Sequence, residues 1–119
     1  MSNVVKEKSF AFAVRVVRLY GYLCKEKKEI VLSKQLLRSG TAIGASVREA
    51  EQAESKADFV HKMAIALKEA SETEYWILLL HETKFLTAKE SESILGDIAE
   101  LLKLLTSIIK STKAQNRPQ

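Results

Sequence analysis

The side chains best suited to metal chemistry in this sequence are two histidines in its middle third. His61 and His81 stand in one segment of helical period, twenty residues apart, so a helix would separate them by roughly 30 Å. They cannot share a metal ion within one subunit. Asp58-x-x-His61 resembles one arm of a di-iron site, but that site needs such a motif on two helices and a glutamate on two others. We therefore expect no metal site and no cofactor.

A second candidate for chemistry is a cluster of carboxylates formed by Glu69, Glu72 and Glu74. Paired carboxylates can act as general acid and base. No nucleophile, histidine or glycine-rich loop accompanies them in the sequence, which favours a solvated face with salt bridges to neighbouring helices. Glu72 is the one expected to point inward, and a buried glutamate needs a partner such as Arg38 or Arg48. The sequence predicts a protein that is not an enzyme.

Basic side chains form the more suggestive pattern. Two consecutive segments of helical period each carry basic residues along one side, and together these could make a stripe that neutralises phosphates. The six residues are Arg15, Arg18 and Lys25 in the first segment, and Lys34, Arg38 and Arg48 in the second. Two alternatives stay open: a merely solvated face, or structural pairing of Arg38 or Arg48 with Glu72 or Glu49. Few aromatic residues are available for base stacking.

Length and composition set bounds on the rest. The chain has 119 residues, enough for one domain, and a net charge of +4, which permits nucleic-acid binding without requiring it. Cys24 is the only cysteine, and its helical spacing among apolar residues is typical of a small core side chain. No signal peptide opens the chain, and the longest apolar run, Tyr75–Leu80, is far shorter than the roughly 20 residues of a membrane span. We expect a cytoplasmic protein without a membrane partner.

The elements that must position these side chains are helices. The only proline is Pro118, and periods near 3.6 residues fill the sequence. We expect an all-α fold with four helices over about 6–27, 34–54, 56–83 and 88–111, and a frayed tail over 112–119. Ser33 is the expected N-cap of the second helix, and Ser55-x-x-Asp58 and Thr87-x-x-Glu90 are capping boxes for the third and fourth. Short links predict a single antiparallel up-down four-helix bundle over residues 1–119.

Two features of these helices predict close or additional packing. Gly40 and Gly44 stand on one face of the second helix, which predicts a neighbouring helix packed close to it. The alternative is a kink or break near Ser39-Gly40. Tyr75–Leu80 is apolar on all sides, so it must be buried on all sides. A lone bundle exposes one side of every helix, which predicts that this segment makes an oligomer contact.

Ser33–Glu51 and Lys56–Leu80 carry a family resemblance. They resemble the bacterial four-helix-bundle family often encoded by intervening sequences inside 23S ribosomal RNA genes. The resemblance covers nearly the whole chain, including Lys103–Ser111. Ala42 and Ser46 depart from the family pattern, where Ser and Asn are common, which weakens any role for a polar group there. The matching positions are Ile43, Val47, Glu49, Ala50, Phe59, Ala66 and Glu72.

The resemblance implies an assembly and a class of partner. It implies a homopentamer shaped like a short barrel, and kinship with the accessory proteins of diversity-generating retroelements, which are thought to bind nucleic acid and a reverse transcriptase. No established activity follows for the ribosomal-gene members themselves. We expect a non-enzymatic protein that binds RNA or DNA, with RNA as the first candidate. The alternative is a protein-interaction scaffold whose charge is incidental.

Overall fold

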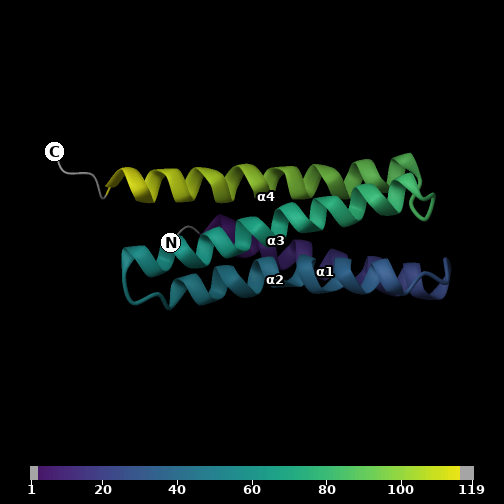
Figure 1. The fold of residues 1–119 in the computed structure, drawn as a ribbon, viewed down its shortest axis with the longest axis horizontal. Coiled ribbons are helices and arrows are strands. Elements are labelled where there is room, and N and C mark those ends of the chain that lie inside the picture. Colours follow the sequence, from purple (N-terminus) through teal and green to yellow (C-terminus); the bar gives the residue numbers. More distant parts are fainter. Residues whose placement is uncertain (1–2, 116–119) are drawn as a thin grey trace.

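A computed structural model of the chain describes residues 3–115, and all of its regular structure in that range is helical. The four helices lie side by side along the long axis of a molecule measuring 55 × 22 × 20 Å (Figure 1). They are α1 (Asn3–Lys25), α2 (Val31–Glu51), α3 (Lys56–Glu82) and α4 (Ala88–Gln115). The all-α prediction is therefore confirmed.

The links between helices alternate between the two ends of the molecule. The α2–α3 turn lies at one end, and the α1–α2 and α3–α4 links lie at the other (Figure 1). Each helix contacts the next one along the chain, and α1 also contacts α4. Four helices with this pattern of neighbours enclose one central core.

The core consists of one apolar stripe from each helix. In α2 this stripe contains Leu36, Ile43, Val47 and Ala50, all of which are buried. In α1 only one of its two apolar stripes faces inward, with Phe12, Val16 and Leu23 buried. The other stripe faces outward, since Phe10 is 57% exposed and Val17 is 52% exposed. α3 and α4 complete the core with Met63, Ala66, Ala70, Ile77, Leu80, Ile94, Ile98, Leu101, Leu105 and Ile109.

The starts of α3 and α4 are capped as the sequence predicts. The Ser55 side chain accepts a hydrogen bond from the backbone N–H of Asp58 at 3.0 Å. Thr87 and Glu90 form the reciprocal pair of a capping box, with the Thr87 N–H donating to the Glu90 carboxylate at 2.8 Å and the Glu90 N–H donating to the Thr87 hydroxyl at 3.1 Å. The capping box at α4 is therefore confirmed. At α3, Ser55 is confirmed as the N-cap, but the Asp58 carboxylate accepts a hydrogen bond from the backbone N–H of Glu54 at 3.3 Å and none from Ser55, so the reciprocal half of that box is absent there.

The predicted N-cap of α2 is wrong. α2 begins at Val31, and Ser33 is a buried residue inside its first turn. The Glu29 carboxylate caps the helix, because it accepts hydrogen bonds from the backbone N–H of Ser33 at 2.8 Å and from the backbone N–H of Leu32 at 3.2 Å. It also accepts the Ser33 hydroxyl at 2.8 Å. A carboxylate in the preceding link replaces the expected serine side chain.

Other helix ends differ from the expected ranges by a few residues. The helix expected over 6–27 spans Asn3–Lys25, and the one expected over 34–54 spans Val31–Glu51. Just after α1, Lys28 adopts a left-handed conformation with φ 56°, which a right-handed helix cannot include. α4 runs on to Gln115, beyond the expected end at 111, and the rest of the expected frayed tail, 116–119 with Pro118, lies outside the described residues.

The two glycines of α2 lie where α1 approaches closely. A Cβ atom on Gly40 would stand 2.9 Å from both Cγ atoms of Val16, and one on Gly44 would stand 3.4 Å from the carbonyl oxygen of Ser9. α2 is one helix through both positions, so the alternative of a break near Ser39-Gly40 is wrong. The predicted close neighbour is α1, and the contact is tightest at Gly40.

Candidate nucleic-acid interface

The six basic residues of the predicted stripe fall into two groups, and Arg15 belongs to the paired group. Its guanidinium reaches from α1 to α4, where it forms an ion pair with Asp97 and donates hydrogen bonds to the hydroxyl and the carbonyl of Ser93. Lys8 makes a parallel ion pair with Glu100 at 2.8 Å one turn further along α4. Arg15 therefore links two helices, and its charge is already compensated.

Arg38 is the other paired residue. It lies on α2 and binds two carboxylates of α3, Glu69 at 3.0 Å and Glu72. The pKa of the Glu72 carboxyl group is lowered mainly by the hydrogen bond from Arg38. A second hydrogen bond, from the Trp76 indole N–H at 3.2 Å, lowers it further. This confirms the predicted pairing of Glu72 with an arginine and identifies Arg38 as the partner. Glu49, the other suggested carboxylate, pairs instead with Lys62 at 3.7 Å.

Arg48 keeps its charge without a carboxylate partner among residues 3–115. Its guanidinium lies over the ring of Phe10 on α1, with the central carbon 5.7 Å from the ring centroid. This is a cation–π contact, which orients the side chain and leaves its N–H groups available to an acceptor. Phe10 and Arg48 border a small groove between α1 and α2, lined also by Ala13, Thr41 and Gly44.

The remaining three residues, Arg18, Lys25 and Lys34, are exposed and form no ion pair within the described part of the chain. Lys25 ends α1 and Lys34 lies in the first turn of α2, so both lie near the α1–α2 link, which also carries Lys27 and Lys28. Glu29 of this link is committed to capping α2. Three of the four unpaired cations of the predicted stripe thus lie on the second half of α1 and the first turn of α2, whereas Arg48 lies in the last turn of α2, toward the other end of the molecule.

The other candidates for chemistry form no convergent site. Glu69 and Glu72 are bound to Arg38, His61 is exposed and His81 is half-buried. No group of three or more His, Cys, Asp or Glu side chains suited to holding a metal ion occurs within residues 3–115. Cys24 is half-buried, where a core side chain was expected.

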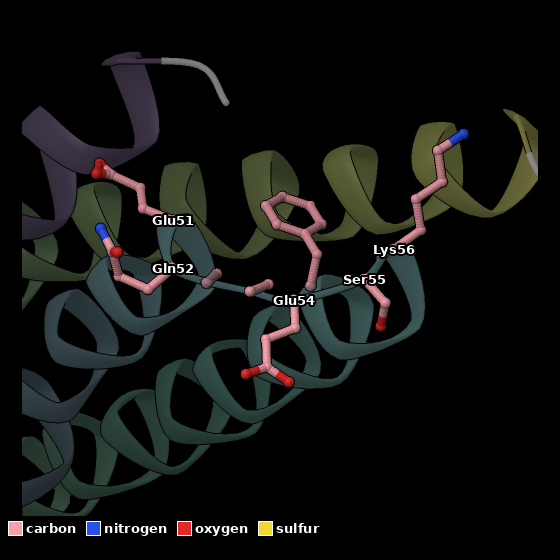
Figure 2. A pocket seen from close by; sticks show the side chains of 8 residues that line it. Glu51, Gln52, Glu54, Ser55 and Lys56 are labelled. Carbon is pink, nitrogen blue, oxygen red and sulfur yellow. The ribbon is translucent and has the colours of Figure 1, made fainter.

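A concavity at the α2–α3 turn gathers several polar side chains without aiming them at one point. Figure 2 shows the side chains of Glu51, Gln52, Glu54 and Lys56 pointing in different directions from the turn. Glu51 is already paired with Lys6 of α1 at 2.9 Å. An active site needs functional groups that converge on a reacting atom, and this concavity lacks that arrangement.

Within the described part of the chain, no helix combines the length and apolarity that crossing a bilayer requires. The fold and its surface define a small all-helical protein in which several surface charges tie neighbouring helices together.

The chain belongs to the 23S rRNA-intervening sequence protein family, whose model matches residues 1–107. It is also similar to a crystal structure from Bacteroides thetaiotaomicron, a protein of unknown function from the S23 ribosomal protein family. The two sequences are 61% identical, the match covers 89% of this chain and 98% of the other, and the TM-score is 0.88. No curated protein sequence matches this chain. The comparisons thus confirm the family suggested by the resemblance, and they assign no activity.

Proposed function

We propose that this protein is a non-enzymatic bundle that binds nucleic acid, with RNA as the first candidate, through the phosphate backbone. One observation carries the proposal: four basic side chains of α1 and α2 are exposed and have no carboxylate partner within residues 3–115. These are Arg18, Lys25, Lys34 and Arg48. Unpaired cations can displace the counterions of a nucleic acid, and the release of those counterions drives binding.

Arg15 and Arg38, which were predicted from the sequence as phosphate-binding residues, have a structural role in this proposal. Each is already bound to carboxylates on a neighbouring helix. A phosphate would have to compete with those carboxylates, so these two arginines contribute little to binding. Their part is to hold α1 against α4 and α2 against α3.

We further propose that the chain forms an antiparallel up-down bundle that assembles as a homo-oligomer, with five subunits as the first candidate. The exposed apolar side chains support this proposal. Tyr75 is 57% exposed and Leu78 is 48% exposed on α3, within the segment that is apolar all round, and Phe10 and Val17 are exposed on α1. Adjacent exposed apolar side chains mark interaction surfaces. In a symmetric ring each basic patch is repeated, so modest contacts add by multivalency.

Two matched variants test the assignment of residues. Changing Arg18, Lys25, Lys34 and Arg48 to Gln should strongly weaken the binding of labelled RNA at low salt and leave the circular dichroism spectrum unchanged. Changing Arg15 and Arg38 to Gln should leave RNA binding close to that of the wild type and lower the thermal midpoint. If the first variant binds as well as the wild type, the assignment fails. If the wild-type protein itself shows no binding to RNA or DNA, a protein-interaction scaffold becomes the better proposal.

A further inference from the structure

A second basic surface, outside the predicted stripe, lies on the C-terminal half of α4. The two halves of this helix have opposite charge. Residues 88–100 contain Lys89 and four acidic residues, whereas residues 101–119 contain four basic residues and no Asp or Glu. A net charge taken over the whole segment conceals this division. The four basic residues are Lys103, Lys110, Lys113 and Arg117, of which Arg117 lies outside the described residues.

The positive charge of this surface is not compensated within residues 3–115. Lys103, Lys110 and Lys113 are exposed, and none of them forms an ion pair there. The two carboxylates of α4 nearest to these lysines are already engaged with α1, since Asp97 pairs with Arg15 and Glu100 pairs with Lys8. The lysines therefore face solvent beside acids whose charge is already partnered.

The geometry of the surface suits a row of phosphates. Lys103 and Lys110 border an open concavity on one face of α4, together with Ser107 and Ser111. The seven-residue separation of the two lysines corresponds to about 10.5 Å along the helix axis, so the two ammonium groups can contact different phosphates of one strand. The hydroxyls of Ser107 and Ser111 have no hydrogen-bond partner in the described structure, so they are available as further donors to phosphate oxygens.

A purely structural explanation covers only part of this pattern. Lysines near the C-terminus of a helix interact favourably with its dipole, but this effect is confined to the last turn. Lys113 lies in the last turn of α4. Lys110 lies just before that turn and Lys103 about two further turns upstream, where the dipole gives no reason for a lysine.

The surface also differs from a site for a protein partner. Protein interfaces are anchored by large apolar or aromatic side chains at their centre. The large apolar side chains exposed among the described residues lie on α1, on α2 with its N-cap Ile30, and on α3. α4 has no aromatic residue on which a base could stack. Exposed lysines and hydroxyls without an apolar anchor favour contact with the backbone of a nucleic acid.

We propose that the C-terminal half of α4 is a second phosphate-binding surface, in which Lys103, Lys110 and Lys113 contact the backbone of the same nucleic acid. This inference rests on the proposed function and adds α4 to the basic residues of α1 and α2. Recognition of phosphate alone makes binding at this surface indifferent to base sequence.

The test compares two variants that lose the same charge. Lys103, Lys110 and Lys113 are changed to Gln in one, and Lys68, Lys84 and Lys89 in the other, which are likewise exposed and without an ion pair among residues 3–115. RNA binding is measured by fluorescence anisotropy across a salt series, with circular dichroism as the control for folding. Each lost phosphate contact lowers the slope of log K against log salt by about 0.7–0.9, so the α4 variant should lose about 2 from that slope and the control variant much less.

The possible outcomes separate this inference from the proposed function. If both variants keep the wild-type slope, or lose equal amounts, the α4 surface makes no specific contact and the inference fails, while binding through α1 and α2 stands. If the wild-type protein binds no nucleic acid, both fail together. If the α4 variant keeps its RNA binding but loses binding to a poly-glutamate peptide that the wild type binds, the surface belongs to an acidic protein partner, and the inference is overturned.

Discussion

Among single residues, Glu29 has the clearest structural part. It is only 9% exposed, in the link that joins α1 to α2. Burial alone would raise the pKa of its carboxyl group, but hydrogen bonds from the backbone N–H and hydroxyl of Ser33 and from the backbone of Leu32 and Val31 outweigh it and lower the pKa below 4.5. The ionised form is therefore the form that caps α2.

Replacing Glu29 should destabilise the fold in two measurable steps. Glu29→Ala removes the cap and should lower the free energy of unfolding by about 1–2 kcal/mol. Glu29→Gln keeps one acceptor oxygen and loses the charge, so its loss should be smaller. Urea titration monitored by circular dichroism at neutral pH gives both values. Equal stability of all three proteins would mean that Glu29 caps nothing.

The lowered pKa of Glu29 also predicts how this contribution depends on pH. The contribution is complete above the ordinary carboxyl pKa of 4.5 and is lost as the pH falls through the lower pKa of the folded state. The stability difference between wild type and Glu29→Gln should therefore shrink as the pH falls below about 4.5. A difference that stays constant down to the acid unfolding transition would contradict this assignment.

Among elements, the contact of α1 with α2 is the one most sensitive to a single methyl group. Gly40→Ala would place a Cβ atom 2.9 Å from the branched side chain of Val16, which is buried and cannot move aside. It should lower the free energy of unfolding by about 1–3 kcal/mol. At Gly44 the nearest atom is 3.4 Å away, so Gly44→Ala should be close to neutral, and only a larger side chain such as Leu should overpack.

Gly96→Ala is the matched control for this pair. No atom lies within 4 Å of a Cβ at Gly96, which stands exposed on α4. Alanine there should raise stability by up to about 1 kcal/mol, because glycine is the weaker helix former. The thermal midpoints of the three alanine variants should therefore rise in the order Gly40→Ala, Gly44→Ala, Gly96→Ala. If Gly40→Ala is as stable as Gly44→Ala, the close approach at Gly40 is not as described.

The elements also explain how much of this fold the sequence could predict. The starts of α3 and α4 were predicted because Ser55 and Thr87 bond within their own first turn, so that chemistry is local. The start of α2 was missed because its cap is a carboxylate that reaches forward from the link. The inward stripe of α1 could not be separated from the outward one, since Phe10 and Phe12 look alike until α2 and α4 are placed around the helix.

The candidate interface was only partly predictable for a similar reason. From the sequence, Arg38 could be either a free cation on a basic face or the structural partner of Glu72. Only the position of α2 against α3 decides between these two roles. Arg15 gave no such hint, because its partner Asp97 is 82 residues away. Lys103 and Lys110 were passed over because the acids at the start of α4 balance them in a sum over the segment.

At the scale of the whole molecule, the exposed apolar side chains predict an oligomer in solution. Light scattering at micromolar concentration should give a mass several times the 13.4 kDa of one chain. Changing Tyr75 and Leu78 to Glu places charges on the exposed apolar part of α3 and should lower that mass without unfolding the helices. A monomer mass for the wild-type protein would contradict this prediction.

The central claim is that the molecule binds nucleic acid through phosphates, and the most direct test is the affinity of the wild-type protein for labelled RNA and DNA of unrelated sequences across a salt series. We expect similar affinities for different sequences and a steep linear fall of log K with log salt, with a slope of about 2.8–3.6 in magnitude from the four unpaired residues of α1 and α2. No binding at low salt, or binding that salt leaves unchanged, would contradict the claim.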